Sequence, residues 1–233
     1  MPFVPALVIV DVQEDFCPPN GSLAVTDGRS IVPLLNTLLS YPFPLKIATK
    51  DFHPRNHISF ASNHPPPNNK AFESVITITN PLNPGESQET RLWPVHCVKD
   101  TPGSELVPEL HVDKVHEIVE KGMDQRVEMY SAFADPFKQP CVSRSGLAKM
   151  LHDKGVTDVF VAGLAADYCV RYTALDAAKE GFKTRVVEEA TKAVDPASMD
   201  EVLREYAEAG VEVIGKDDAS IERVRHYAYP GQV

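Results

Sequence analysis

Residues Asp158 to Ala174, with the sequence DVFVAGLAADYCVRYTA, decide the fold of this chain. The run Val159–Ala162 is apolar and partly β-branched, which predicts a short buried strand that Gly163 ends. From Tyr168 onward the apolar residues follow the spacing of a helix. Cys169 stands at this change from strand to helix, where the unpaired amides of a helix N-terminus are expected to lower the pKa of a thiol. The residue is therefore a candidate nucleophile, and the alternative is a small core cysteine.

The pattern of strand and helix continues on both sides of this stretch. We expect further strands at Ala6–Val10, Leu45–Thr49, Val115–Val119, Thr184–Val187 and Val211–Ile214. We expect helices at Ile31–Leu39, Ser143–Lys154, Tyr168–Glu180 and Ser198–Ala209. Short connections between alternating elements are typical of βαβ units, whose strands form a parallel sheet. The prediction is a three-layer α/β/α sandwich with a central, mainly parallel β-sheet, which residues 1–233 form as a single domain.

The connection after the second of these strands is unusually long. It runs from about Pro54 to Thr90, is rich in proline and asparagine, and contains a possible hairpin strand at Ser74–Thr79. Connections of this length in compact domains are usually functional or disordered. Beyond it, Leu106–Leu110 suggests a short helical turn.

Composition limits the partners and the compartment. The net charge of -10 argues against a nucleic-acid partner, because binding to phosphates requires a basic surface. The apolar N-terminal segment has no basic region, and Asp11 interrupts it too early for a signal peptide or a membrane span. We therefore expect no membrane partner and a cytoplasmic protein, with nucleus and peroxisome left open. The cysteines form no CxxC pair and are expected to be free thiols, of which only the last reacts: Cys17, Cys97, Cys141 and Cys169.

Four reactive side chains fall near the carboxyl ends of predicted strands: Asp11, Asp51, Lys121 and Cys169. In open parallel sheets, ligands bind at this edge. A carboxylate can take the proton of a thiol, and an ammonium group can hold both anions in a partly buried site. Asp11, Lys121 and Cys169 therefore have the composition of base, orienting group and nucleophile in a catalytic triad. Taken singly, Asp11 is more often a turn or helix-cap residue and Lys121 a surface lysine.

Asp51 and His53 are two residues apart, so on an extended segment both side chains point to the same side. Such a pair suits two ligands of one metal ion, and His57 and His96 are candidates for a third. Two imidazoles and a carboxylate suit zinc, iron or manganese with coordination positions left open. The other histidines are expected at the surface: His64, His111, His116, His152 and His226.

Aromatic residues close in sequence to these groups could line a flat apolar slot for an aromatic ring: Phe16, Phe52, Trp93 and Tyr130. For Phe52 we favour a place in the core. The small residues Ala165 and Ala166 let the backbone approach a ligand closely. The N–H groups of Ala165 and Cys169 could then form an oxyanion hole.

Five stretches of the chain are similar, in family order, to the nicotinamidases of the isochorismatase-like cysteine hydrolases. Between Ala6 and Ala177 these are ALVIVDVQEDFCPPNGSLAV, TKDFHPRNHISFASNH, LWPVHCVKDTPGSEL, EKGMDQRVEMYSAF and VAGLAADYCVRYTALDA. The version LWPVHCVKDTPGS, with a long preceding loop and YSAF after the lysine, resembles the fungal nicotinamidases in particular. The resemblance covers most of the chain and implies the isochorismatase-like hydrolase fold.

The resemblance also implies roles for individual residues. It implies one divalent metal ion, usually zinc, with iron or manganese as alternatives. The implied catalytic triad is Asp11, Lys121 and Cys169, and the implied metal ligands are Asp51, His53 and His96. A cis peptide bond is implied between Leu164 and Ala165, which would bring the Ala165 amide into the oxyanion hole. His57 is expected to support the ligands through hydrogen bonds, because the loop histidine of some bacterial relatives has a wider spacing.

For function, the resemblance implies conversion of nicotinamide to nicotinate and ammonia through a thioester on Cys169, a step of NAD salvage. The substrate ring would lie between Phe16, Trp93 and Tyr130, with its nitrogen toward the metal, directly or through water. Two alternatives are a sibling amidase that acts on another small amide and a non-catalytic metal or redox sensor. The expected partner is a small molecule, and a homo-oligomer is left open.

Overall fold

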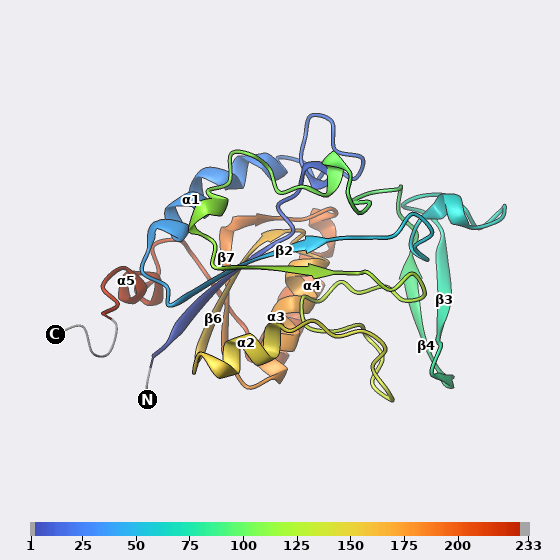
Figure 1. Cartoon of the computed structure of the whole chain (residues 1–233). Coiled ribbons are helices and arrows are strands. Elements are labelled where there is room, and N and C mark those ends of the chain that lie inside the picture. The colour runs from blue at the N-terminus through green and yellow to red at the C-terminus, as the bar shows by residue number, and fades with distance from the viewer. Residues whose placement is uncertain (1–2, 229–233) are drawn as a thin grey trace.

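The core of the protein is a six-stranded sheet. The structure, a computed structural model, describes residues 3–228. The strands lie in the order β5-β2-β1-β6-β7-β8, and each pair of neighbours is parallel. Their bounds are β1 Pro5–Val10, β2 Leu45–Asp51, β5 Glu117–Lys121, β6 Asp158–Leu164, β7 Lys183–Lys192 and β8 Glu212–Ile214. The predicted central parallel sheet is confirmed (Figure 1).

Helices cover both faces of this sheet (Figure 1). One face carries α1 Val32–Ser40 and α5 Ala219–Arg225, and the other carries α2 Leu147–Asp153, α3 Cys169–Lys179 and α4 Met199–Ala209. The predicted three-layer α/β/α sandwich is therefore confirmed. None of the helices within residues 3–228 has the length and the apolar character that crossing a membrane requires.

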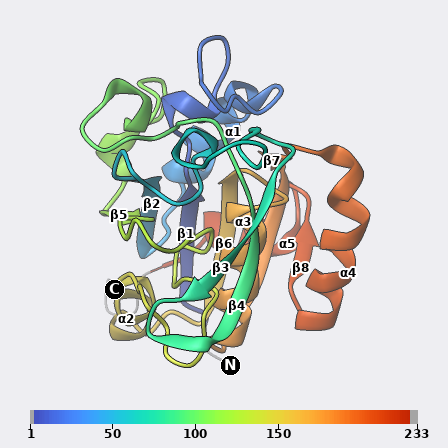
Figure 2. The ribbon, with the colours of Figure 1, turned by 90° about the vertical axis from the view of Figure 1, so that its right-hand side faces the viewer.

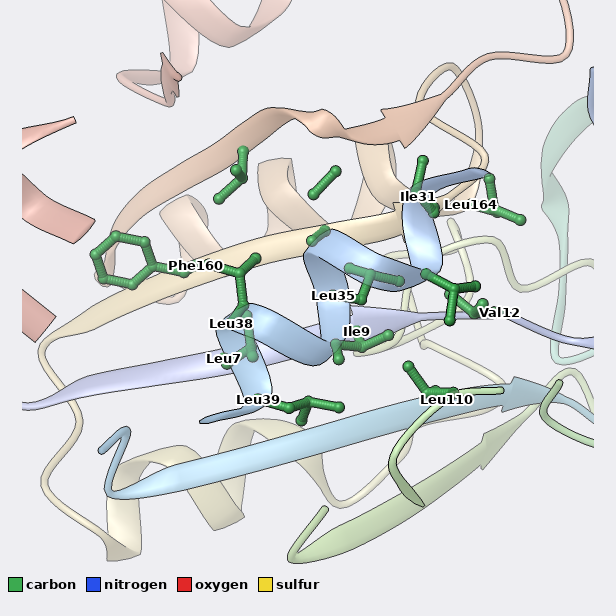
Figure 3. Packing of buried hydrophobic residues seen from close by; sticks show 14 of the residues in the cluster. Leu7, Ile9, Val12, Ile31, Leu35, Leu38, Leu39, Leu110, Phe160 and Leu164 are labelled. Atoms are coloured by element: carbon green, nitrogen blue, oxygen red, sulfur yellow. The ribbon is translucent and has the colours of Figure 1, made fainter. Parts of the chain in front are cut away.

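The period of two along each strand separates two hydrophobic cores. Phe160 belongs to the core on the α1 side, whereas its neighbour Val161 belongs to the core on the α3 side. On the α1 side, Leu38 lies over Leu7 of β1 and Leu35 lies over Ile9, as Figure 3 shows. Strands β1 and β6 are buried on both faces, which explains why their sequences are almost continuously apolar.

A separate hairpin is formed by β3 (Val75–Asn80) and β4 (Asn83–Arg91). The hairpin stands at one side of the molecule in Figure 1, and Figure 2 shows it as a long twisted ribbon across the face turned to the viewer. The predicted hairpin strand Ser74–Thr79 agrees with β3, whereas its partner β4 is not located from the sequence. β4 is polar and mostly exposed, so antiparallel pairing with β3, and not an apolar pattern, makes it a strand.

The segment Leu106–Leu110, for which a short helical turn is predicted, contains a single turn, in which Leu110 N donates to Val107 O at 3.0 Å, but no helix. Leu106 forms a β-bridge with Gln13 instead. The amide of Val107 also donates to Val12 O at 3.0 Å. This pairing fastens the segment beside the chain that follows β1.

Two helices differ from the prediction. α2 begins at Leu147 and not at Ser143, because the residues before it pair with an earlier segment: Arg144 forms an antiparallel bridge with Ala134, and Ser145 N donates to Phe133 O at 2.9 Å. α5 has no counterpart among the predicted helices. Asp218 caps it by accepting from Ser220 N at 2.7 Å. Its 7 residues are too few for helical periodicity to be recognised in the sequence.

The carboxyl ends of β1, β2, β5 and β6 meet at one edge, because these strands are parallel neighbours. β2 and β5 run further than predicted, so that Asp51 and Lys121 pair as their last residues. Gly163 lies opposite Val10, and a Cβ on it would be 2.1 Å from Val10 O. Its φ of +119° is also a conformation that L side chains rarely adopt, so glycine is required here.

Candidate active site

Asp11, Lys121 and Cys169 meet at this edge of the sheet. Asp11 follows β1, Lys121 ends β5, and Cys169 begins α3 shortly after β6. The three residues are buried, with exposed fractions of 0%, 1% and 5%. The carboxylates of Asp11 and Asp51 and the thiol of Cys169 each have an atom within 4.8 Å of the other two. The structure thus brings together the three residues that the sequence selects.

The ammonium group of Lys121 lies at the centre of this cluster. Its Nζ is 3.0 Å from Asp11 Oδ2, 2.5 Å from Asp51 Oδ1 and 3.4 Å from Cys169 Sγ. It also donates to Met129 O at 3.2 Å. Burial favours the neutral amine, but the charges of Asp11 and Asp51 outweigh it and hold the pKa of Lys121 well above its usual range. Lys121 is therefore a permanent positive charge that faces both carboxylates and the sulfur.

The carboxylate of Asp11 is fixed by Thr49. Thr49 Oγ1 donates to Asp11 Oδ1 at 2.5 Å and accepts from the Asp11 amide at 3.2 Å. The other oxygen, Oδ2, lies near Lys121 but receives no well-directed hydrogen bond from a residue within 3–228. Burial raises the pKa of Asp11, and Lys121 counteracts this in part. Oδ2 is therefore placed to accept a proton.

The surroundings of the Cys169 thiol favour its protonated form. Burial raises the pKa of this thiol well above its usual value, Lys121 lowers it, and the negative charges of Asp11 and Asp51 raise it again. The expectation that a helix N-terminus lowers this pKa is wrong, because the sulfur is buried beside carboxylates. A base must remove the proton before the sulfur can react, and Asp11 is in place to do so.

Asp51, His53 and His96 form a second cluster beside the first, with one ligand atom of each within 4.8 Å of the others. His53 Nδ1 is 2.8 Å from Gly122 O and His96 Nδ1 is 2.8 Å from Pro94 O. A carbonyl only accepts, so Nδ1 carries the proton in both rings and Nε2 keeps its lone pair. His53 Nε2 is buried 3.6 Å from Asp51 Oδ2 and has no hydrogen-bond partner among the described residues. An orphaned buried nitrogen beside a carboxylate fits a site for a divalent cation.

The charge states of this cluster agree with that reading. Burial opposes ionisation of Asp51, but Lys121 and His53 outweigh it and hold the pKa of Asp51 far below its usual range. Burial lowers the pKa of His96 to about 4, which keeps the ring neutral. Burial lowers the pKa of His53, but the charge of Asp51 outweighs this effect and raises it above its usual value. A cation bound at Nε2 would displace any proton on this nitrogen. Two imidazoles and a carboxylate form a donor set that zinc, iron and manganese accept.

His57 lies next to this cluster without joining it. Its Nδ1 is 2.8 Å from Ser59 Oγ and its Nε2 is 3.1 Å from Val127 O, so both nitrogens already have hydrogen-bond partners. Its ring stacks on His53, with 4.1 Å between centroids and 29° between planes. The place of His57 agrees with the supporting role that the resemblance implies.

Replacing Gly122 with alanine is expected to weaken metal binding. A Cβ at this position would lie 2.4 Å from His53 Cε1 and 2.6 Å from His53 Nδ1, so the imidazole must leave the carbonyl that orients it. Changes to groups that orient metal ligands typically lower metal affinity by about 10- to 100-fold. The measurement is the metal content of the protein after dialysis against a graded series of chelator concentrations.

Gly155→Ala is the matched control for this substitution. Gly155 has a φ of +64° and Gly122 a φ of +67°, so both variants carry similar backbone strain. A Cβ at Gly155, however, meets nothing within 4 Å. Equal metal affinity in the two variants would show that Gly122 does not position His53.

Aromatic rings flank the two clusters. Trp93 Nε1 donates to Tyr130 OH at 2.9 Å, and the ring of Tyr168 stands edge-on to Trp93 at 4.8 Å between centroids. On the other side, Phe16 packs against His96 at 5.4 Å. Phe16 therefore contacts a candidate metal ligand, and Trp93 and Tyr130 pack against Tyr168, the residue before Cys169. Sequence reasoning missed Tyr168, although its position directly before Cys169 could have pointed to it.

Two backbone amides beside the thiol are free to donate. Those of Ala165 and Cys169 bind no backbone acceptor within the described part of the chain, whereas the amide of Ala166 donates to Lys192 O at 2.8 Å. The peptide bond between Leu164 and Ala165 is cis, as the resemblance implies. Cys169 is the first residue of α3, where an amide has no partner inside the helix. Both amides are thus available for the predicted oxyanion hole.

Sequence reasoning also missed two polar residues that hold the site. Thr49 binds Asp11, and Gln13 binds both backbone groups of Asp51. Each stands two residues from an aspartate of the site, so the alternation of an extended segment could have indicated them. Their hydrogen bonds join residues that are 38 positions apart in the sequence, however, and no local pattern shows such bonds.

The other residues considered in the sequence lie outside the site. Phe52 is buried in the core, as predicted. The four cysteines are free thiols, which confirms that prediction. Of the five remaining histidines, His64 is half-buried and the others are exposed: His111, His116, His152 and His226.

Known proteins share the fold and the sequence of this chain. The isochorismatase domain family matches residues 5–218. The nicotinamidase of Schizosaccharomyces pombe is 38% identical over 227 residues, which cover 97% of this chain and 99% of that protein. The yeast nicotinamidase bound to the inhibitor nicotinaldehyde has a TM-score of 0.83 and 34% identity, covering 91% of this chain and 100% of that one. The pyrazinamidase of Pyrococcus horikoshii in complex with zinc has a TM-score of 0.69 and 34% identity, covering 91% and 99%. The chain therefore belongs to the isochorismatase family and, within it, to the nicotinamidases.

Proposed function

We propose that the protein hydrolyses nicotinamide to nicotinate and ammonia through a thioester on Cys169, as a step of NAD salvage. The observation that carries the proposal is the buried ammonium group of Lys121, which is 3.0 Å from Asp11 and 3.4 Å from the sulfur. The same ammonium group also forms an ion pair with Asp51, so it connects the nucleophile and the base to a residue of the candidate metal cluster. Relatives named nicotinamidases, one of them with bound nicotinaldehyde, support the choice of a pyridine amide.

The first step is formation of the thiolate. Asp11 Oδ2 takes the proton of Cys169, and the negative charge moves from the carboxylate to the sulfur beside Lys121. The thiolate then attacks the carboxamide carbon and forms a C–S bond, while the carbonyl oxygen becomes an oxyanion. The amides of Ala165 and Cys169 donate to that oxygen. Since Lys121 stays charged throughout, it stabilises each anion in turn.

The second step releases ammonia. Asp11 returns its proton to the amide nitrogen, the C–N bond breaks, and the oxyanion collapses to the thioester. A water molecule then gives a proton to Asp11 and attacks the thioester carbon. Breakage of the C–S bond yields nicotinic acid, which releases its proton to solvent as nicotinate, and the proton on Asp11 returns to the sulfur. One carboxylate thus serves as base and then as acid in each half of the reaction.

Asp51, His53 and His96 would hold the metal ion, for which zinc is the proposed identity. The zinc in the Pyrococcus horikoshii relative supports this choice, with iron and manganese as alternatives. When bound, the cation supplies a Lewis acid for the lone pair of a pyridine nitrogen. Phe16 and Trp93 would hold the ring flat between them, and Tyr130 fixes Trp93 through its hydrogen bond. The metal cluster therefore selects the ring, while the triad acts on the amide.

The proposal is tested by a hydrolysis assay and elemental analysis of the same purified sample. Nicotinamide, pyrazinamide and small aliphatic amides are supplied separately, and ammonia and the carboxylate product are both quantified. We expect nicotinate and ammonia in equal amounts and a divalent metal in the protein. Turnover of another amide without turnover of nicotinamide would identify a sibling amidase. A metal-loaded protein that turns over no amide would instead support a sensor.

A further inference from the structure

We propose that Gln13 is a positioning residue, which fixes Asp51 for both the candidate metal cluster and Lys121. The need for such a residue arises where β1 ends. β1 and β2 are paired only as far as Ile9 and Ala48, and the chain after β1 then leaves the sheet. The amide of Phe52, which follows Asp51, donates to Lys121 O of β5 at 2.9 Å. Because the backbone groups of successive residues in a strand point to opposite sides, the N–H and C=O of Asp51 point toward β1. Without a neighbouring strand there, they would be buried and unpaired.

The side chain of Gln13 fills the place of the missing strand. Its Oε1 accepts from the Asp51 amide at 2.8 Å, and its Nε2 donates to Asp51 O and to Ser104 O, each at 2.8 Å. The residue is 0% exposed. A primary amide offers an acceptor and two donors, and the three groups around it use all of them. No hydrocarbon or carboxylate side chain can reproduce this set.

The position of Asp51 matters because its two oxygens face different groups. Oδ1 is 2.5 Å from Lys121 Nζ, and Oδ2 is 3.6 Å from His53 Nε2. Gln13 also donates its own amide to Asp11 O at 2.9 Å, so a single residue links the proposed base to this carboxylate. A shift of the Asp51 backbone would therefore disturb metal binding and the charge balance around Lys121 together. The effect on turnover rests on the proposed function, whereas the effect on metal binding does not.

The test replaces Gln13 with methionine, which keeps the length of the side chain and removes all three hydrogen bonds. We expect the affinity for Zn²⁺, measured by competition with a chelator, to fall by about tenfold or more. We also expect the visible absorption spectrum of the Co²⁺-substituted protein to change, because the ligand geometry changes. Gln13→Glu keeps the acceptor for the Asp51 amide but directs a carboxylate oxygen at two carbonyls. It should change affinity and spectrum in the same direction, and it provides a second variant if the first does not fold.

Asn80→Leu is the matched control. Asn80 is also 0% exposed, and its Nδ2 donates to Glu86 Oε2 and Pro140 O while its Oδ1 accepts from Leu82 N, all at 2.9 Å. This substitution removes two hydrogen bonds within the hairpin and one between the hairpin and Pro140, so it should lower the melting temperature and leave the metal affinity and the cobalt spectrum unchanged.

The possible results separate the two proposals. Gln13 variants that keep the wild-type metal affinity and cobalt spectrum would overturn the positioning role, whatever their melting temperatures. If the wild-type protein has no activity toward nicotinamide, the proposed substrate is refuted. Weaker metal binding by the Gln13 variants would still support the positioning role in that case.

Discussion

Replacing Cys169 with alanine is expected to lower kcat for nicotinamide hydrolysis by at least about 10⁴-fold, because loss of the nucleophile removes the covalent route altogether. The melting temperature should stay near that of the wild type. Burial favours the neutral thiol, and the side chain is small, so its removal leaves the ion pairs of Lys121 with Asp11 and Asp51 in place. Steady-state ammonia release and a thermal melt of the same sample give both values.

Cys17→Ala is the control for Cys169→Ala. Cys17 is also buried, and burial raises the pKa of its thiol to about 11, but it lies in the hydrophobic core on the α1 side and not in the site. Its removal should leave kcat within about twofold of the wild type and lower the melting temperature by a small amount, as for other small cavities. Equal activity in Cys169→Ala and Cys17→Ala would remove Cys169 from the mechanism.

Replacing Lys121 with methionine is expected to reduce both stability and activity. The substitution leaves the carboxylates of Asp11 and Asp51 buried together without their shared cation. Removing one partner of a buried ion pair typically costs about 3–5 kcal/mol of unfolding free energy. We expect kcat to fall by about 10³-fold or more, because nothing then balances the thiolate and the oxyanion. Urea denaturation of the metal-free protein measures the first effect and ammonia release the second.

The stability lost in Lys121→Met should depend on pH. In the wild type, Lys121 and His53 hold the folded-state pKa of Asp51 below its unfolded value, so its stabilising contribution is present above the unfolded pKa and is lost as the pH falls. In the variant, uncompensated burial raises the carboxylate pKa above the unfolded value, so stability is lost as the pH rises. The difference in unfolding free energy between the two proteins is therefore expected to be larger at about pH 7 than at about pH 5. A difference that does not change with pH would contradict this electrostatic role.

Lys50→Met is the control for Lys121→Met. Lys50 lies in the same sheet and is 7% exposed. Its Nζ is 3.1 Å from Glu105 Oε2, but the side chain of Glu105 is exposed to solvent. Such a pair contributes about 0–1 kcal/mol, so its loss should be small and nearly independent of pH over this range.

The central sheet and its helices could be predicted because their signals are local. β1 and β6 are buried on both faces and read as continuous apolar runs, and α3 and α4 have helical spacing with glycine beyond their ends. The hairpin strand β4 could not be recognised, since its sequence is polar and its pairing with β3 alone defines it. α5 is too short to show a period.

The candidate site was predictable in its members and not in its electrostatics. Asp11, Lys121 and Cys169 could be selected because parallel strands bring their carboxyl ends to one edge. The protonation state of Cys169 could not, because burial and Asp11 oppose the effect of Lys121 on its pKa. The supporting bonds of Thr49 and Gln13 likewise depend on which strands become neighbours.

Hydrolysis through an acyl group on Cys169 is tested most directly by mass spectrometry of protein quenched in acid during turnover of nicotinamide. Samples are taken over a series of quench times, digested, and examined for every peptide that carries a nicotinoyl group. We expect a fraction of the peptide that contains Cys169 to carry this group as a thioester, which hydroxylamine releases. No such peptide should appear with Cys169→Ala. Nicotinate production with Cys169 unmodified at every quench time, or with the acyl group on another residue, would contradict the proposed mechanism.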